Sequence, residues 1–271
     1  MTSHDVVARV RRACDTRKVG HAGTLDPMAT GVLVLGVNRA TRLLGHLTLT
    51  EKAYEATVRL GAATTTDDAE GQVIANASAV DLTEDAVRTA LEAFRGEILQ
   101  VPSSVSAIKV DGVRSYTRAR SGEDVELAAR PVTVHEIEVH DVRREGGFLD
   151  LDVRVRCSSG TYVRALARDL GAALGVGGHL TALRRTAVGP FTLDAADTDL
   201  DAPRLVPIAD AARAAFPSVD LDDDQATDVR FGRKLELGLG AGPHALFAPD
   251  GEFLALYEQD GALARAVAVF V

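Results

Sequence analysis

The chain has 271 residues, of which 46% are hydrophobic, so it can bury a sizeable core, divided between a large domain and a small one. Its net charge of −9, taken alone, argues against a protein that binds nucleic acid. Cys14 and Cys157 are isolated and no H-E-x-x-H spacing occurs, which argues against a disulfide framework and a zinc site. The sequence has no apolar run of about 18 residues and no signal-peptide pattern, so we expect neither a membrane span nor secretion and predict a cytoplasmic protein.

The first half of the chain predicts helices and strands in alternation. Ser3 is the expected N-cap of an opening helix, and Asp5 lies in its first turn, where a carboxylate is favourable. Short apolar and periodic runs predict a buried strand at residues 32–35, a helix at 38–47, a strand at 52–60 with Tyr54 and Leu60 on one face, and a helix at 83–94.

The second half resumes with strand signals after an irregular segment. Residues 102–129 mix Ser, Gly and charges, which indicates an excursion from the core sheet. Alternation at 131–142 and 148–157, separated by Glu145-Gly146-Gly147, predicts a hairpin, residues 162–170 predict a helix, and residues 179–193 fit a strand or its exit.

The character changes after about residue 200. Residues 201–271 hold 6 basic and 12 acidic side chains, a net charge of −6. An acidic linker is expected around residues 220–224, and alternating runs at 244–247, 253–257 and 262–270 predict a small β domain.

Basic residues gather in two places despite the acidic total. The first cluster comprises Lys109, Arg114, Arg118 and Arg120, with Asp111 as the only acid, and the second comprises Arg9, Arg11, Arg12, Arg17 and Lys18. Such clusters permit RNA binding, and ordinary solvated surfaces explain them equally well.

The run from His21 to Gly31 sets one carboxylate on a shaped loop. Gly23 and Gly31 allow positive φ or a close backbone approach, and Pro27 biases Asp26 away from helix. An Asp-Pro pair alone is usually an ordinary turn. The eleven residues in this order, H-A-G-T-L-D-P-M-A-T-G, closely resemble the motif around the catalytic aspartate of TruB-type tRNA pseudouridine synthases, which isomerise the uridine at position 55 of the T-arm.

Two further motifs occur in the order found in that family. They are the strand Lys52–Ala56 (K-A-Y-E-A) and Gly160–Arg164 (G-T-Y-V-R). The resemblance implies an α+β pseudouridine-synthase fold: a large mixed, mainly antiparallel sheet flanked by helices, with a thumb insertion. It also implies a catalytic domain at residues 1–200, an RNA-gripping thumb at about 102–131, and an acidic linker with a small β-rich PUA-like domain at 201–271.

The resemblance implies roles for three catalytic side chains. Asp26 would be the nucleophile or base, Arg164 the cation that pairs with it, and Tyr54 the ring that stacks on the flipped base and is a candidate for proton transfer at C5. Judged by residue type alone, a strand tyrosine is more often core, and an arginine at a helix start more often pairs with a surface acid.

Four substrate-binding residues are also implied. His21 matches a histidine that inserts into the T-loop, Tyr162 and Leu183 match pocket walls, and Lys109 lies in the thumb-like segment. A lone histidine or leucine is more often structural than functional.

The implied reaction breaks a C–N glycosidic bond, rotates the uracil and forms a C–C bond, so it is redox-neutral and we expect neither a cofactor nor a metal. Three alternatives remain open for the first chemical step: attack at the base, attack at the ribose, or removal of the C2′ proton. We expect tRNA, through its T-arm stem-loop, as the partner of a monomer with no obligatory protein partner and no membrane attachment.

Three other functions are considered. A tRNA-folding chaperone with weak or no catalysis would need the thumb and His21 but not Asp26. A phosphatase or dehalogenase with an aspartyl nucleophile would need a second Asp two residues on, where Met28 stands. A guide-dependent synthase would need extensions for partner proteins, which we do not find.

The N-terminus departs from the family pattern. Family members usually have an apolar strand ending in Asp-Lys-Pro-x-Gly before the Thr-Ser-His segment, whereas this chain begins Met1-Thr2-Ser3-His4. We expect the loss of that strand to expose a sheet edge and to weaken the support of the loop around Asp26.

Overall fold

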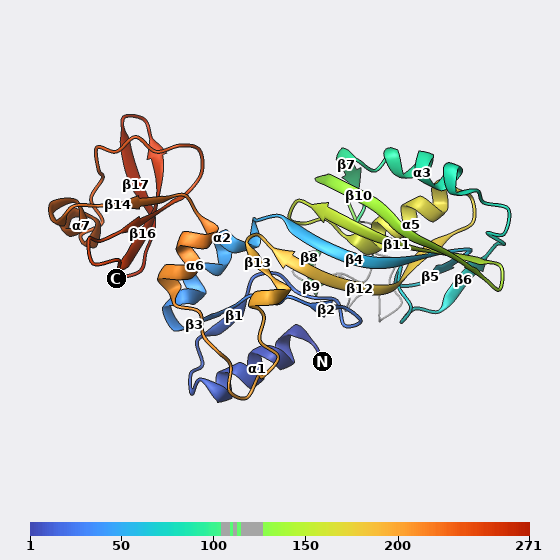
Figure 1. Cartoon of the computed structure of the whole chain (residues 1–271), viewed down its shortest axis with the longest axis horizontal. Helices are drawn as coiled ribbons and strands as arrows, with labels where there is room; N and C mark the ends of the chain where they lie inside the picture. The colour runs from blue at the N-terminus through green and yellow to red at the C-terminus, as the bar shows by residue number, and fades with distance from the viewer. Residues whose placement is uncertain (104–108, 111–112, 115–126) are drawn as a thin grey trace. The chain divides into compact units, whose positions relative to one another are not determined.

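The computed structural model describes residues 1–103, 109–110, 113–114 and 127–271 (Figure 1). The chain forms two compact units. Unit 1 comprises residues 1–3, 23–33 and 48–196, and unit 2 comprises residues 4–22, 34–47 and 197–271. No helix in the described ranges is long and apolar enough to cross a membrane.

Unit 1 is built on a seven-stranded sheet in the order β13-β12-β4-β11-β10-β7, with β2 paired to β12. Its strands are β2 (Thr30–Gly31), β4 (Lys52–Leu60), β7 (Gly96–Gln100), β10 (Arg130–Glu145), β11 (Phe148–Cys157), β12 (Gly178–Val188) and β13 (Phe191–Thr192). All neighbours are antiparallel except β2 and β12. Figure 1 shows the four long strands β10, β11, β4 and β12 side by side, so the predicted mixed, mainly antiparallel sheet is confirmed.

Period-two alternation decides which face of this sheet is buried. On β4, Ala56, Val58 and Leu60 enter the hydrophobic core, while Glu55 is exposed. The turn between β10 and β11 places Gly146 and Gly147 at φ of 58° and 89°, as a two-residue hairpin turn requires. The strands predicted at 52–60, 131–142 and 148–157 are therefore confirmed.

Two helices cover the buried face of the sheet. They are α3 (Glu84–Glu92) and α5 (Val163–Ala173). Thr83 caps α3 by accepting a hydrogen bond from Ala86 N–H, and both helices place apolar side chains in the same core as the strands. Smaller elements of unit 1 are β5 (Ala62–Thr64), β6 (Val73–Asn76), β8 (Lys109–Val110), β9 (Val113–Arg114) and η2 (Leu193–Ala195).

Unit 2 joins N-terminal and C-terminal segments of the chain. Its elements are α1 (Ser3–Ala13), β1 (Val19–His21), β3 (Leu35–Val37), η1 (Asn38–Arg42), α2 (Leu44–Thr48), α6 (Ile208–Ala215), β14 (Ser218–Asp220), α7 (Asp223–Arg230), β15 (His244–Phe247), β16 (Phe253–Asp260) and β17 (Leu263–Val269). β14 to β17 form one sheet in chain order, and β1 pairs with β3. Arg39 and Arg42 donate to the carbonyls of Phe270 and Val269, at 3.4 and 3.0 Å.

The structure corrects several expected element boundaries. Ser3 is the first helical residue rather than the cap. Only Leu35 of the strand predicted at 32–35 lies in a strand, because the chain there passes from pairing with β12 to pairing with β1. The helix expected at 38–47 is a 3-10 turn followed by α2.

The acidic segment at 220–224 is not a linker. Asp220 ends β14, and Asp222 caps α7 in a capping box with Gln225, so the acids lie where the helix N-terminus favours negative charge. The domain boundary expected near residue 200 remains a prediction, since unit 2 also takes in residues 4–22 and 34–47.

Candidate active site

The loop between Gly23 and Gly31 presents Asp26 at the edge of the unit 1 sheet. Gly23 and Gly31 have φ of 95° and 98°, which L side chains rarely adopt. A Cβ on Gly31 would lie 2.1 Å from the carbonyl oxygen of Arg185, so this residue must be glycine. At the centre of the loop, the Asp26 carbonyl accepts a hydrogen bond from Ala29 N–H at 2.9 Å.

Ser3 fastens the same loop from the start of the chain. Its buried hydroxyl accepts a hydrogen bond from Leu25 N–H at 2.9 Å and lies 3.4 Å from the Leu25 carbonyl. The backbone next to Asp26 is therefore held by a side chain that precedes it by more than twenty residues.

Asp26 faces Arg164, at the start of α5. Arg164 Nε donates to Asp26 Oδ2 at 2.9 Å, and Nη2 donates to Oδ1 at 2.8 Å, a bidentate arrangement. The arginine side chain is 3% exposed, whereas that of Asp26 is 31% exposed. The carboxylate therefore remains open to a ligand while a buried guanidinium holds both of its oxygens.

A second carboxylate holds the other side of Arg164. Arg164 Nη1 donates to the Thr66 carbonyl at 2.9 Å and lies 3.4 Å from Asp68 Oδ2. Asp68 is itself buried and is held by the Thr66 hydroxyl and by Glu70 N–H. Arg164 is thus fixed by two carboxylates and a carbonyl, which leaves its guanidinium one orientation toward Asp26.

One turn further along α5, Arg168 also pairs with a buried carboxylate, that of Asp67. Its Nη1 lies 3.3 Å from Asp67 Oδ2, and its Nη2 donates to the Val101 carbonyl at 2.7 Å. Burial raises the pKa of the Asp67 carboxyl above its usual range, against the opposing effects of Ser103 and Arg168. These contacts fasten the loop at 64–71 to the helix that bears Arg164.

Tyr54 lies on β4, opposite Arg185 of β12 and Val155 of β11. Burial raises the pKa of the Tyr54 phenol to about 12, while a hydrogen bond and the charge of Arg185 act in the opposite direction. The charge of Asp26 also affects this pKa, so the phenol and the carboxylate share one neighbourhood. A partly buried ring whose hydroxyl stays protonated at neutral pH suits a stacking surface.

Tyr162 and Leu183 occupy supporting positions. Tyr162 is the N-cap residue of α5, and the buried Gln100 side chain bonds both its N–H, at 2.8 Å, and its carbonyl, at 3.1 Å. Leu183 is buried in the unit 1 core, where Met28 and Tyr54 also pack. Leu183 therefore belongs to the same core as Met28 of the Asp26 loop and the Tyr54 ring.

The remaining two predicted residues are His21 and Lys109. His21 ends β1 in unit 2, where its ring meets His4 edge-on with centroids 6.0 Å apart. Lys109 begins β8, and its side chain, like most of the insertion expected at 102–131, lies outside the described residues.

Three residues important to the geometry were missed from the sequence. Asp68 sits in a turn-rich acidic stretch, Arg185 follows the recognised Leu183, and Gln100 ends an edge strand. Only Arg185 carried a signal, since a cation that interrupts an apolar strand calls for a buried partner.

The residues place a carboxylate, a buried guanidinium and a phenol on adjoining elements, a set suited to proton transfer and nucleophilic attack. No group of three or more His, Cys, Asp or Glu side chains suited to a metal ion occurs among the described residues.

The sequence matches three known families along most of its length. Residues 11–163 match the family described as TruB family pseudouridylate synthase (N terminal domain). Residues 164–206 match the tRNA pseudouridylate synthase B C-terminal domain, and residues 216–271 match the family described as tRNA Pseudouridine synthase II, C terminal.

Similar proteins include two from actinobacteria. A tRNA pseudouridine synthase B of Arthrobacter sp. (strain FB24) is 59% identical over 286 residues, covering 99% of this chain and 92% of the relative. A tRNA pseudouridine synthase B of Nocardia farcinica (strain IFM 10152) is 61% identical over 275 residues, covering 100% and 89%.

Solved structures show the same fold. A chain of a Cbf5-Nop10-Gar1 complex has a TM-score of 0.72 and 26% identity, covering 100% of this chain and 82% of that one. A chain of an archaeal box H/ACA sRNP Nop10-Cbf5 complex has a TM-score of 0.70 and 26% identity, covering 100% and 83%.

Proposed function

The chain belongs to the TruB family of pseudouridylate synthases, and we propose that it isomerises the uridine at position 55 in the T-arm of tRNA to pseudouridine, with Asp26 as the catalytic carboxylate. The enzyme class and the tRNA substrate follow from relatives about 60% identical over nearly the whole chain. The observation that supports the choice of Asp26 is its bidentate pair with the buried Arg164.

Asp26 would act in the ionised form, as nucleophile or as base toward the ribose. When an RNA base covers the site, water is excluded and the charged carboxylate loses hydration, which disfavours ionisation. Arg164 offsets that loss because it is already desolvated and aimed at both carboxylate oxygens. The bond broken, uracil N1 to C1′, and the bond formed, C5 to C1′, leave the oxidation state unchanged; C5 releases a proton, and N1 gains one from solvent.

The target base must leave the folded T-loop before it can meet Asp26. We assign Tyr54 to stack on the flipped uracil and to serve as a candidate for taking the C5 proton, with Tyr162 and Leu183 as walls of the pocket. His21 and Lys109 are proposed to contact the T-arm, His21 in the space left by flipped nucleotides.

We propose that the protein acts as a monomer without an obligatory protein partner, in the cytoplasm, where tRNA is processed. In support, Asp26, Arg164 and Tyr54 all come from unit 1 of a single chain. We also propose that residues 1–200 carry catalysis and that residues 201–271 form a PUA-like domain. Sedimentation of the purified chain, with and without tRNA, tests the oligomeric state.

Tritium release tests the reaction and the role of Asp26 together. Purified protein should release tritium from tRNA whose uridines are labelled at C5, and Asp26→Asn should abolish release while its circular dichroism matches the wild type. Retained turnover in the variant would exclude Asp26 as the catalytic group. Binding and refolding of tRNA by a wild-type chain that forms no pseudouridine would instead favour the chaperone function.

A further inference from the structure

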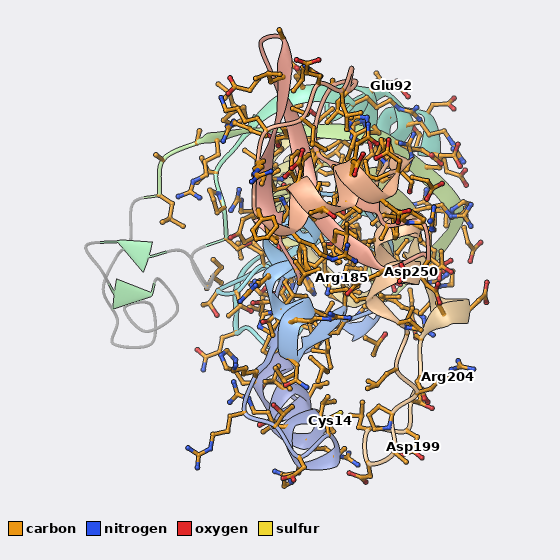
Figure 2. The ribbon with its side chains drawn as sticks, turned by 90° about the vertical axis from the view of Figure 1, so that its left-hand side faces the viewer. Cys14, Glu92, Arg185, Asp199, Arg204 and Asp250 are labelled. Atoms are coloured by element: carbon orange, nitrogen blue, oxygen red, sulfur yellow. The ribbon has the colours of Figure 1, made fainter. Side chains whose placement is uncertain are left out.

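Arg185, labelled in Figure 2, is a buried cation beneath the Asp26 loop. The residue is 2% exposed. Nε donates to the Val32 carbonyl at 2.8 Å, Nη1 to the Thr24 carbonyl at 3.3 Å, and Nη2 to the Gly23 carbonyl at 3.2 Å. Across the described part of the chain, its partners are carbonyl oxygens and a phenol, and none is a carboxylate.

These three bonds join the two ends of the loop. Gly23 and Thr24 precede Asp26, and Val32 follows it, so a single guanidinium holds both sides of the loop at once. The Arg185 backbone adds a fourth tie, since its carbonyl accepts from Val32 N–H at 2.8 Å. The planar, forked guanidinium suits this task because its donors point in fixed directions.

The same side chain also interacts with the Tyr54 phenol, through a hydrogen bond and through its charge. Arg185 and Tyr54 are directly opposite in the β12–β4 pairing, which places their side chains on one face of the sheet. The register of β12 shifts immediately after Arg185, and such a bulge redirects a side chain at the end of regular pairing. One group therefore touches both the loop that presents Asp26 and the ring proposed to stack on the base.

Burying a cation without a carboxylate is costly, and a purely structural site would be filled as well by an apolar side chain. The cost is understandable if the charge is needed at the phenol: the Tyr54 oxygen must release its own proton to water before it can take the C5 proton, and a nearby cation stabilises the phenolate that forms. Arg164 cannot supply this charge because its guanidinium is already paired with the carboxylates of Asp26 and Asp68.

We propose that Arg185 is a positioning residue that fixes the Asp26 loop against Tyr54 and supplies positive charge to the phenol during proton transfer. The inference rests on the proposed function, since it gives Arg185 a part in the same reaction. It predicts that Arg185 affects the chemical step much more than tRNA binding.

The first test measures tritium release and tRNA affinity for Arg185→Lys and, as a matched control, Arg154→Lys, whose exposed side chain lies on β11. Lysine keeps the charge but cannot bond three carbonyls in fixed directions. We expect kcat to fall about 100-fold in Arg185→Lys, because a small misplacement of catalytic groups costs that much. We expect KM to change by less than about 3-fold, and Arg154→Lys to match the wild type.

Chemical rescue separates charge from shape. Arg185→Ala should be nearly inactive and should regain turnover when millimolar guanidinium is added, whereas urea, the same shape without the charge, should restore nothing. Equal rescue by urea would overturn the role of the charge. Wild-type kcat in Arg185→Lys, or a loss seen only in KM or in thermal stability, would overturn the positioning role.

Hydrogen exchange supplies a readout that needs no activity. Peptides spanning residues 23–32 should exchange faster in Arg185→Lys than in the wild type, while peptides from β11 should not. Unchanged exchange of this loop would contradict the inference even if the enzyme is active. A wild-type chain that releases no tritium but shows the expected exchange would refute the proposed reaction and leave the loop-fixing role of Arg185 standing.

Discussion

Arg164 meets Asp26 through two parallel hydrogen bonds of 2.9 and 2.8 Å, although the two residues are 138 positions apart in the chain. Both residues belong to unit 1: Arg164 lies in the first turn of α5, and Asp26 lies on the loop that leads into β2. The loop gives the carboxylate its exposure, and the helix gives the cation its burial.

Replacing Arg164 by lysine should remove most activity without removing the charge. Lysine cannot bond both oxygens of Asp26 and also reach the Thr66 carbonyl, so Asp26 loses its fixed orientation. We expect kcat for tritium release to fall by about 100-fold or more. Arg88→Lys, an exposed position on α3, should match the wild type, and equal activity of the two variants would contradict the role of Arg164.

Replacing Gly31 by alanine should disrupt the same loop through its backbone. The new Cβ would lie 2.1 Å from the Arg185 carbonyl, at a φ of 98° that alanine rarely adopts. We expect a loss of unfolding free energy of about 2 kcal/mol or more, from strain and the displaced strand pairing, and loss of turnover.

Gly45 is the control for that substitution. It lies in α2 with ordinary φ, and a Cβ added there would have no neighbouring atom within 4 Å, so Gly45→Ala should be neutral or slightly stabilising. Chemical denaturation of both variants measures the difference. A Gly31→Ala protein as stable and active as Gly45→Ala would show that the loop can shift.

Lys52 should make the stability of unit 1 depend on pH. It is buried and donates to the Thr48 and Thr50 carbonyls, and burial, followed by the charge of Arg185, lowers the pKa of Lys52 to about 8 from 10.5. Between about pH 8 and pH 10.5 Lys52 carries a proton in the unfolded chain but not in the folded chain, so the free energy of unfolding rises with pH over this range.

Comparison with Lys52→Met isolates this effect from other alkaline titrations. The unfolding free energy of the wild type minus that of the variant should increase by about 2 kcal/mol from pH 8 to pH 10. Denaturant titrations at fixed pH values give the difference directly. A flat or falling difference over this range would mean that Lys52 keeps its ordinary proton affinity in the fold.

Asp222 should stabilise unit 2 through the capping box of α7. Asp222→Ala removes the bond to Gln225 N–H, at 2.8 Å, and should cost about 1 kcal/mol of unfolding free energy. Asp224→Ala, in the first turn, loses only a favourable charge and should cost less. Equal thermal stability of the two variants would contradict a specific capping role.

The sequence predicted the parts of the fold that local periodicity controls. β4, β10, β11 and α5 were recognised because their apolar residues repeat at the period of the element and their ends are marked by Gly or by cap residues. The acidic stretch before α7 was wrongly predicted because charge alone suggests a linker, whereas the same acids cap a helix when Gln225 lies three residues after Asp222.

The candidate site was predictable only where a motif marked it. Asp26, Tyr54 and Arg164 belong to recognisable runs, and the structure places all three in unit 1. Asp68 and Gln100 act through tertiary contacts with Arg164 and Tyr162, and no local pattern records such contacts. Packing of distant segments, rather than propensity, decides these roles.

Unit 2 is built from segments near both ends of the chain, which has a consequence for synthesis on the ribosome. Arg39 and Arg42 donate to the carbonyls of Phe270 and Val269, so segments made early must wait for the last residues to be translated. Such long-range closure is slow and leaves this part of unit 2 unfinished in the meantime. A nascent chain stalled before its last few residues should therefore hold a folded sheet in unit 1 and an unfinished unit 2, and should depend on chaperones until release.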